Sequence, residues 1–405
     1  MTRRHILRSA NVVSLLTGLS RVTGLLREGL MAYFFGTSLA KSAFDVAFQW
    51  PNLLRNLLGE GALSAAFIPV FGESIEKEGR EKAHEMAGRV MALLGLTLAV
   101  IVAAGILLIT CLLGTVSFGP KAAAVLPLLR IMLPYTFFIC LVALGMAILN
   151  SFRRFGLAAS TPVVMNVVMI LTLVLICPWY GTSTTERVYV AAWGVIGAGV
   201  LQFACQIPAL VRVGFRPEVS FAWRQDARVR RVLLLMGPVA LGLGVFQINV
   251  VVDGLLALVA APWAPAALTY AQRIVYLPLG LFGTAMGIVL LPTLSRHVAR
   301  NEQGEILSTI GMALRNLIVM MLPASAGLLV LATPIVQLVY AWSGGQFTDR
   351  SVALTARALA FYAPGLVLFS MYKVFVPAFY ALKDTWTPVR VGMGAVALNF
   401  VLNVL

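Results

Sequence analysis

Ten charged residues lie within, or at the edge of, long apolar stretches of this sequence, where charge is costly. They are Arg21, Arg27, Glu28, Asp45, Arg55, Glu60, Arg130, Asp253, Arg273 and Lys373. A charged side chain at the centre of a bilayer costs about 2.5–3.5 kcal/mol on insertion scales, so each residue indicates a polar cavity lined by protein. The alternatives are a structural ion pair or a side chain that reaches the membrane surface from a helix end.

Three of these cations, Arg21, Arg27 and Arg55, lie deep in the first two apolar stretches, with few carboxylates nearby. Glu28 directly follows Arg27, so we expect it to point to another side of the helix and to be a poor partner. Arg273 occupies the equivalent region of the second half of the chain. Guanidinium groups bind phosphate through paired hydrogen bonds. The surplus of cations therefore predicts an anionic ligand, either a polyanion that crosses the membrane or a lipid with a phosphate head group.

The sequence offers no set of residues for catalysis. It contains no nucleophile–base–acid arrangement and no nucleotide-binding motif, and its four cysteines stand singly in apolar stretches. We therefore expect no catalytic residue and no organic cofactor, and the predicted class is a transporter and not an enzyme.

The elements that position these charges are apolar helices. Of 405 residues, 60% are hydrophobic and 12% are charged, which excludes an ordinary soluble globule. Helices of about 20 apolar residues cross about 30 Å of hydrocarbon. The predicted spans are 12–35, 43–71, 90–113, 126–149, 157–179, 189–210, 233–260, 267–294, 314–340, 353–380 and 389–405. The predicted fold class is an all-α polytopic membrane protein with about eleven spans.

Basic residues alternate between the connections of these spans. The connections on the side of the N-terminus hold 20 Lys and Arg residues, against 5 on the other side. Those five are Lys41, Lys121, Arg187, Arg350 and Arg357. This asymmetry predicts a cytoplasmic N-terminus. It also explains most of the net charge of +15 without a nucleic-acid partner.

An internal repeat is indicated at an offset of about 225 residues. The second span closes with a proline at Pro69 and the eighth at Pro292, while Thr161-Pro162 recurs as Thr387-Pro388. These pairs stand six spans apart, so they predict two lobes of equal orientation, a parallel repeat typical of transporters. The alternative is that proline simply favours helix ends. The predicted lobes are 1–211 with spans one to six and 232–405 with spans seven to eleven, joined by a cytoplasmic linker at 212–231. Six spans in the first lobe imply six in the second, so we expect a chain that is incomplete at its C-terminus.

Several motifs resemble one family. The most specific are SRVTGLLRE at 20–28, VAFQWPNLLR at 46–55 and GEGALSAAFIP at 59–69. Further matches are YAQR at 270–273, LLP at 290–292 and KVFVPAFYA at 373–381. With these motifs, the chain resembles the MurJ (MviN) lipid II flippases of the multidrug/oligosaccharidyl-lipid/polysaccharide exporter superfamily.

The resemblance implies a function and a site. Such proteins move the undecaprenyl-pyrophosphate-linked peptidoglycan precursor, lipid II, to the outer leaflet of the bacterial inner membrane, by alternating access of two six-helix lobes. A cationic central cavity is implied for the diphosphate, and a functional link to the enzymes of peptidoglycan synthesis. The substrate-binding residues implied by the motifs are Arg21, Arg27, Arg55, Arg273, Asn52, Glu60 and Lys373.

The chain departs from the family pattern at two positions. The family often has an acid at the position of Ser42, and here the nearest acid is Asp45. The family often has a second arginine at position 56, and here the residue is Asn56.

A cation site is also implied, because some members resemble a sodium-coupled design. Asp253 on the seventh span, with Asn399 and Asn403 four residues apart on the eleventh, fits that pattern. Oxygen ligands suit a hard cation such as sodium. The alternative is a structural pair between Asp253 and a nearby arginine.

Two other functions compete with a lipid II flippase. The first is a flippase for another lipid-linked oligosaccharide, or a drug/cation antiporter of the same superfamily, although an antiporter should line its cavity with acids and aromatic residues. The second is a membrane transferase acting on polyprenyl phosphates, which would need clustered acidic metal ligands. The dense acidic run at 73–85 is instead interleaved with Lys and Arg.

Overall fold

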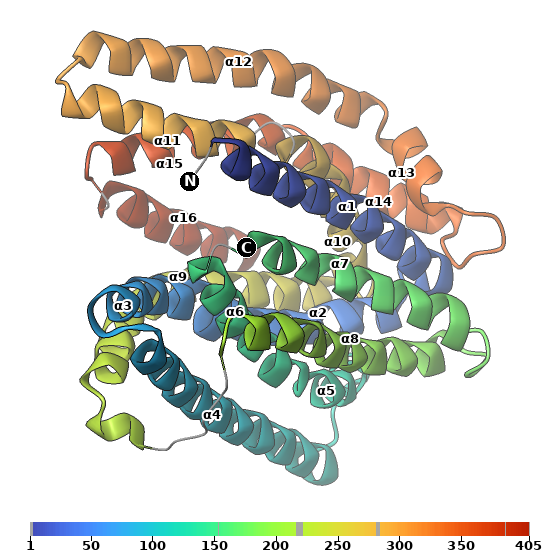
Figure 1. Cartoon of the computed structure of the whole chain (residues 1–405). Coiled ribbons are helices and arrows are strands. Elements are labelled where there is room, and N and C mark those ends of the chain that lie inside the picture. The colour runs from blue at the N-terminus through green and yellow to red at the C-terminus, as the bar shows by residue number, and fades with distance from the viewer. Residues whose placement is uncertain (1–2, 153, 216–221, 281–283, 385, 405) are drawn as a thin grey trace. The chain divides into compact units, whose positions relative to one another are not determined.

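The computed structural model describes residues 3–152, 154–215, 222–280, 284–384 and 386–404, and within these ranges every regular element is a helix (Figure 1). The chain divides into two compact units, Met1–Met31 with Ser38–Pro262, and Ala32–Thr37 with Trp263–Leu405. The predicted linker is partly helical, because α9 begins at Ala227, and its residues 216–221 lie outside the described ranges.

The first unit holds α1 to α9, apart from the last turn of α1. Their bounds are α1 Arg3–Phe35, α2 Leu39–Leu54, the π-helix η1 Arg55–Gly61, α3 Ala62–Glu78, α4 Arg80–Thr115, α5 Pro120–Met132, α6 Tyr135–Ser151, α7 Phe155–Leu171, the π-helix η2 Thr172–Ile176, α8 Thr184–Arg212, the 3-10 helix η3 Ala222–Gln225 and α9 Ala227–Ala260. Helix α2 packs on α5 and α9, α3 packs on α9, and α8 packs on α6 and α7.

Small residues bring helices of this unit close together. A side chain on Gly199 of α8 would collide with the ring of Tyr135, which is buried on α6. A side chain on Gly254 of α9 would collide with the amide of Gln49 on α2. The Gly254 contact lies between α9 and α2, and α2 carries Asn52 and leads into η1, which carries Arg55 and Glu60.

The second unit holds the remaining helices. They are α10 Ala264–Pro278, α11 Thr284–Ala299, α12 Gln303–Val330, α13 Ala332–Tyr340, α14 Asp349–Tyr362, α15 Gly365–Ala381 and α16 Trp386–Val404. Helix α10 packs on α14, and α15 packs on α11 and α12. At its centre, the fully buried Tyr340 donates a hydrogen bond to the carbonyl of Tyr270 at 3.0 Å. Tyr270 in turn donates to the carbonyl of Gly36 at 3.1 Å, which fixes α10 against the end of α1.

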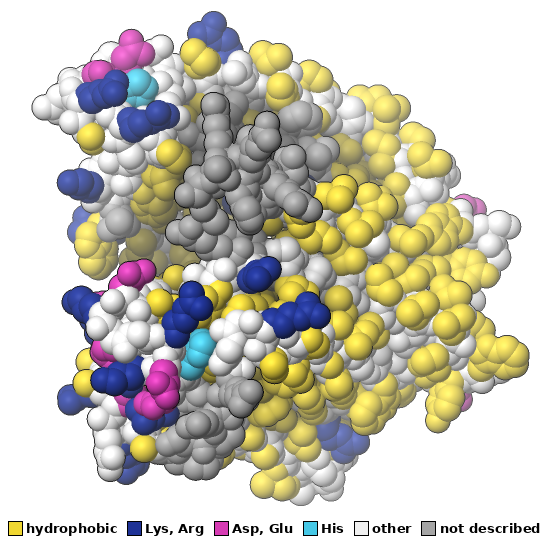
Figure 2. Space-filling view, in the orientation of Figure 1, with side chains coloured by type: hydrophobic (Ala, Val, Ile, Leu, Met, Phe, Trp, Pro, Cys, Tyr) yellow, Lys and Arg dark blue, Asp and Glu magenta, His cyan; other side chains and the backbone are white. Residues whose placement is uncertain are grey.

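Apolar side chains also cover the outside of the helices. Helix α4 exposes Leu96, Val100, Leu107 and Leu108, by 49%, 59%, 66% and 61%. Figure 2 shows such side chains over much of the visible face, while charged side chains gather around α3 and α4 of the first unit and, separately, at the α11–α12 connection of the second. A surface of this kind suits contact with lipid rather than with water.

Within the described ranges, five helices have the length and composition to cross a membrane. They are Arg80–Thr115, Ala159–Ile176, Thr184–Arg212, Ala227–Ala260 and Gln303–Val330. Two pairs, α5 with α6 and α14 with α15, add two more if each bent pair is one span. The predicted apolar ranges largely coincide with helices or runs of helices, but several runs are interrupted near a proline, as at Pro134 and Pro364. The multi-pass helical class is therefore observed, and the count of about eleven spans stays a prediction.

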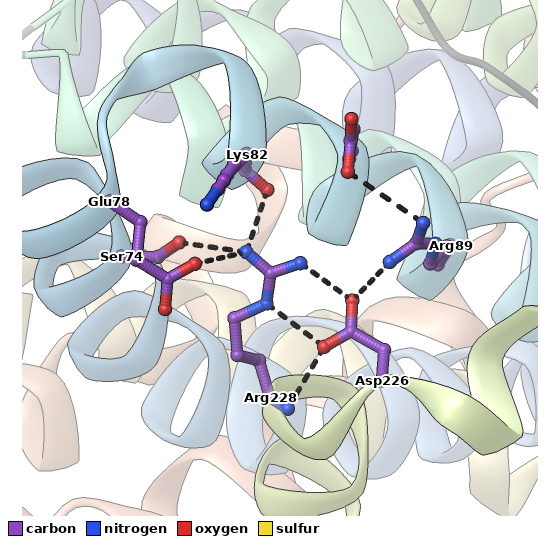
Figure 3. Close-up of polar contacts among 7 residues, drawn as sticks. Ser74, Glu78, Lys82, Arg89, Asp226 and Arg228 are labelled. Carbon is purple, nitrogen blue, oxygen red and sulfur yellow. Dashed lines mark hydrogen bonds and ion pairs between the residues drawn. The ribbon is translucent and has the colours of Figure 1, made fainter.

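An ion-pair network ties the start of α9 to α3 and α4 (Figure 3). Asp226, whose side chain is 3% exposed, accepts from Arg228 Nε and Nη2 at 2.9 Å each and from Arg89 Nη1 at 2.7 Å. Arg228 Nη1 also donates to Glu78 at 2.6 Å and to the carbonyl of Lys82 at 3.1 Å. Burial alone would raise the pKa of Asp226, but the hydrogen bonds from Arg228 and Arg89 outweigh it and lower that pKa to about 2. We name these residues the Asp226 network.

The first prediction concerns the packing of α9 on α2. Gly254→Leu should lower the thermal unfolding midpoint of the purified protein in detergent, because overpacking a tight contact costs about 1–3 kcal/mol. Gly237→Leu is the matched control on the same helix, where an added side chain meets no atom within 4 Å. Equal midpoints for the two variants would contradict the close approach of α2 and α9.

The second prediction concerns the charge of Asp226. Asp226→Asn keeps an N-cap residue for α9 but removes the ion pairs, so it should destabilise the protein at neutral pH by about 2 kcal/mol. A carboxylate with a lowered pKa stabilises the fold above its unfolded pKa of about 4, and this contribution is lost as the pH falls towards 2. The difference in unfolding midpoint between wild type and Asp226→Asn should therefore narrow between pH 6 and pH 3. Glu85→Gln is the control, because Glu85 is 43% exposed and lies 3.7 Å from the same Arg89. A difference that stays constant with pH would refute the assignment.

Candidate functional site

The end of α1 carries a tight ion pair between neighbouring residues. Arg27 Nη2 lies 2.6 Å from Glu28 Oε1, and the two side chains are 13% and 5% exposed. The prediction that Glu28 is a poor partner for Arg27 is therefore wrong. Side chains at successive helix positions leave the axis about 100° apart, but the long arginine side chain can reach around the helix to its neighbour. Arg27 is therefore already paired with Glu28 in this structure.

Lys41 joins this pair from the first turn of α2. Its side chain is 1% exposed, and its Nζ lies 2.5 Å from Asp45 Oδ1 and 3.6 Å from Glu28 Oε2. The sequence analysis placed Lys41 in the connection between the first two spans, whereas the structure places it in α2, where its side chain is buried. We name Arg27, Glu28, Lys41 and Asp45 the buried charge cluster. Its four formal charges sum to zero, as burial of ions requires.

Arg21 faces a cavity of about 440 Å³ in the first unit, between α1, α6 and α7. The polar lining comes from Thr17, Ser20, Arg21 and Asn150. Both Arg21 Nη1 and Asn150 Oδ1 are buried and have no hydrogen-bond partner among the described residues. A guanidinium N–H without an acceptor is costly in such a place, so this cavity suits a ligand that brings an anionic oxygen. Sequence reasoning missed Asn150, because a neutral polar residue near the end of a span resembles an ordinary flank.

Asn166 on α7 fixes the segment of α1 that carries these arginines. Its amide donates to the carbonyl of Ser20 at 2.9 Å and to the hydroxyl of Thr23 at 3.2 Å. Gly24 lies next to this amide: an added Cβ would be in van der Waals contact with the Asn166 amide nitrogen, at 3.4 Å. Asn166 was also missed, and only the pairing of α1 with α7 reveals it.

Arg55 is the first residue of the π-helix η1, four residues after Pro51. Its Nε lies 3.9 Å from Glu60 Oε2, and the side chains are 30% and 41% exposed, so this is a loose pair. A π-helical segment widens the helix and is frequent at functional sites.

Two further polar residues of this stretch form local contacts. Asn52, a predicted site residue, donates to the carbonyl of Phe48 at 3.1 Å, one turn earlier in its own helix. Asn56, which stands where the family often has arginine, donates to Gln247 on α9 at 3.0 Å. Asn56 therefore connects η1 to α9 and supplies no charge.

The other predicted cations belong to the second unit. Arg273 lies on α10 and is exposed, three residues after the fully buried Tyr270. Lys373 lies on α15 and is half-buried. The roles of all seven predicted substrate-binding residues stay predictions.

The predicted cation ligands are also divided between the units. Asp253 on α9 accepts from Asn249 at 3.1 Å, and Asn403 donates to Asn399 on α16 at 3.0 Å. Among the described residues, no three or more His, Cys, Asp or Glu side chains gather as metal ligands do. The sodium site stays a prediction.

Comparison with known proteins identifies the family. The sequence model described as lipid II flippase MurJ matches residues 31–405. A probable lipid II flippase MurJ of Vibrio cholerae is 35% identical over 416 residues, which cover 99% of this chain and 78% of that protein. The lipid II flippase MurJ of Burkholderia cenocepacia is 34% identical over 98% of this chain and 78% of its own length.

Solved structures agree with this result. A lipid II flippase MurJ in an inward closed conformation matches with a TM-score of 0.82 and 27% identity, over 97% of this chain and 80% of that one. An inward-facing multidrug resistance MATE family transporter matches with a TM-score of 0.71 at 15% identity, over 96% of this chain and 88% of that one, and so shares the fold alone. The predicted family is confirmed: the chain belongs to the lipid II flippase MurJ family.

Proposed function

We propose that this chain moves lipid II from the cytoplasmic to the outer leaflet of the bacterial inner membrane. The observation that carries this proposal is the family match, which extends over nearly the whole chain and includes relatives named as lipid II flippases. The chain is accordingly a transporter of the membrane and not an enzyme, and its task connects it functionally with the enzymes that make and use lipid II.

The arginines supply the means to hold the substrate. In this proposal Arg21, Arg27, Arg55 and Arg273 bind the diphosphate, because guanidinium groups present paired N–H donors to phosphate oxygens. The unsatisfied Nη1 of Arg21 and the loose pairing of Arg55 favour this role. Asn52, Glu60 and Lys373 shape the cavity around it.

Alternating access of two lobes, 1–211 with six predicted spans and 232–405 with five, is the proposed mechanism. Two bent helix pairs support the parallel repeat on which it rests. Helices α5 and α6 meet at 45°, α14 and α15 meet at 44°, and each second helix begins after a proline, Pro134 or Pro364. Matching bends at matching places in both halves are expected of a duplicated unit.

We propose that the chain lies in the membrane with its N-terminus in the cytoplasm. The connections on the N-terminal side hold 20 basic residues against 5 on the other side. One of those five, Lys41, lies buried in the first turn of α2, so the comparison of the connections becomes 20 against 4. The alternative substrates are another lipid-linked oligosaccharide or a drug, the latter in exchange for a cation. The arginine-rich first unit favours a diphosphate lipid over a cationic drug.

The third prediction tests the function in cells depleted of their resident lipid II flippase. The full gene product that carries this sequence should restore exposure of lipid II on the outer leaflet. Arg27→Ala and Arg273→Ala should lower this exposure tenfold or more at equal protein level, because a hydrogen bond to a charged group is worth about 1.5–3 kcal/mol.

Arg231→Ala is the matched control, because Arg231 is 59% exposed and pairs with Glu73 at the surface. Failure of the wild-type protein to restore exposure would refute the flippase proposal. Full rescue by both arginine variants would refute only the assignment of the diphosphate-binding residues.

We also propose that Asp253, Asn399 and Asn403 hold a sodium ion, since carboxylate and amide oxygens suit this hard cation. The fourth prediction is that Asp253→Ala weakens sodium binding by the purified protein, measured calorimetrically, by roughly tenfold or more. Asp349→Ala, at the exposed start of α14, should bind sodium as the wild type does. Unchanged sodium affinity in Asp253→Ala would eliminate this site.

A further inference from the structure

Glu28 lies between two cations in the buried charge cluster. Its Oε1 is 2.6 Å from Arg27, and its Oε2 is 3.6 Å from Lys41. The first distance is that of a strong charge-assisted hydrogen bond, whereas the second is an ion pair beyond normal hydrogen-bond length. Lys41 makes its short contact with Asp45, at 2.5 Å. Each cation therefore has one short partner, and Glu28 connects the two pairs.

This arrangement sets a condition on any anion that binds Arg27. A phosphate must compete with Glu28 for the guanidinium N–H groups, because Nη2 of Arg27 already donates to that carboxylate. When Arg27 turns to a phosphate, Glu28, which is 5% exposed, loses its 2.6 Å charge-assisted hydrogen bond, and a buried carboxylate that loses such a bond favours a closer contact with a neighbouring cation. Lys41 is placed to make that contact, because its Nζ already lies 3.6 Å from the other Glu28 oxygen.

We infer that Lys41 is a positioning residue for substrate binding: it takes over Glu28 as counter-ion when Arg27 leaves that carboxylate for an anionic diphosphate. Asp45 keeps Lys41 close to Glu28, and without a ligand the charge of Lys41 is compensated by both Asp45 and Glu28. The inference rests on the proposed function and adds to it a role for Lys41 and Asp45. Neither residue needs to touch the substrate.

The burial of Lys41 distinguishes it from ordinary paired lysines of the chain. Lys77 makes an ion pair of the same i,i+4 spacing with Glu73 at 2.8 Å, but its side chain is 72% exposed, against 1% for Lys41. An exposed pair is solvated and contributes little. Lys41 is instead buried between the carboxylates of Glu28 and Asp45. Its charge therefore affects how strongly Glu28 binds Arg27.

The experiment measures binding of undecaprenyl pyrophosphate to the purified full gene product in detergent. Lys41→Met should weaken binding on the order of tenfold, because Glu28 then keeps Arg27 and the fraction of protein ready to bind falls. Lys41→Met combined with Glu28→Gln should regain most of that affinity, because no carboxylate then holds Arg27. Lys77→Met is the control and should bind as the wild type does.

Asp45→Asn provides a second comparison that does not remove the lysine. Freed from Asp45, Lys41 should compensate Glu28 more fully, so binding should be equal to or tighter than that of the wild type. A purely structural ion pair predicts the opposite, a weaker binding in Asp45→Asn and a double variant worse than Lys41→Met.

Either of those two results, at unchanged unfolding midpoint, would overturn the role of Lys41. A wild-type protein that binds the diphosphate lipid but does not restore lipid II exposure in cells would contradict the proposed function alone, because the binding comparison would still report on Lys41. A wild-type protein that binds no diphosphate lipid would overturn both.

Discussion

The cost of placing charge in an apolar environment is the constraint on which this structure depends. An arginine or lysine in a membrane helix is tolerated only where carboxylates, carbonyls or a polar cavity compensate it. In the first unit, Arg27 and Lys41 are compensated by Glu28 and Asp45, whereas Arg21 faces a cavity. The two arginines therefore differ in what a ligand must do to bind them. At Arg27 a ligand must displace the carboxylate of Glu28, whereas Arg21 Nη1 has no hydrogen-bond partner to displace among the described residues.

Contacts between helices of the first unit hold the segments that carry these charged residues. Asn166 on α7 holds the backbone of α1 at Ser20, and the close approach of Gly254 to Gln49 holds α9 against α2. Helices α1 and α2 are themselves joined by the ion pair between Glu28 and Lys41. At the polar end of the same unit, the Asp226 network fastens the start of α9 to α3 and α4, so the helix that packs on α2 is held at both ends.

The sequence predicts those features of the protein that depend on the types of residue along the chain. Apolar stretches, the charged residues within them and the family motifs are visible without a structure, because membrane helices need about 20 apolar residues in a row. Contacts between side chains are not visible in this way. Lys41 follows a turn at Gly36 and directly precedes the predicted second span, which is a usual place for a solvent-exposed lysine. Only the packing of the helices in the structure shows that its side chain is buried. Helix geometry predicts that Glu28 is a poor partner for Arg27, yet the flexible arginine side chain makes the pair. Asn150 and Asn166 carry no charge and match no motif, so their roles depend on which helices meet.

The central claim is that this chain transports a diphosphate-linked lipid by means of its buried arginines. The most direct measurement is the rate at which lipid II becomes accessible to a membrane-impermeant reagent outside liposomes that contain the purified full gene product. The account predicts a faster rate with the wild-type protein than in protein-free liposomes, no acceleration for phosphatidylcholine, and loss of the lipid II effect in Arg27→Ala. Equal rates in liposomes with and without the protein, or equal acceleration of both lipids, would contradict it.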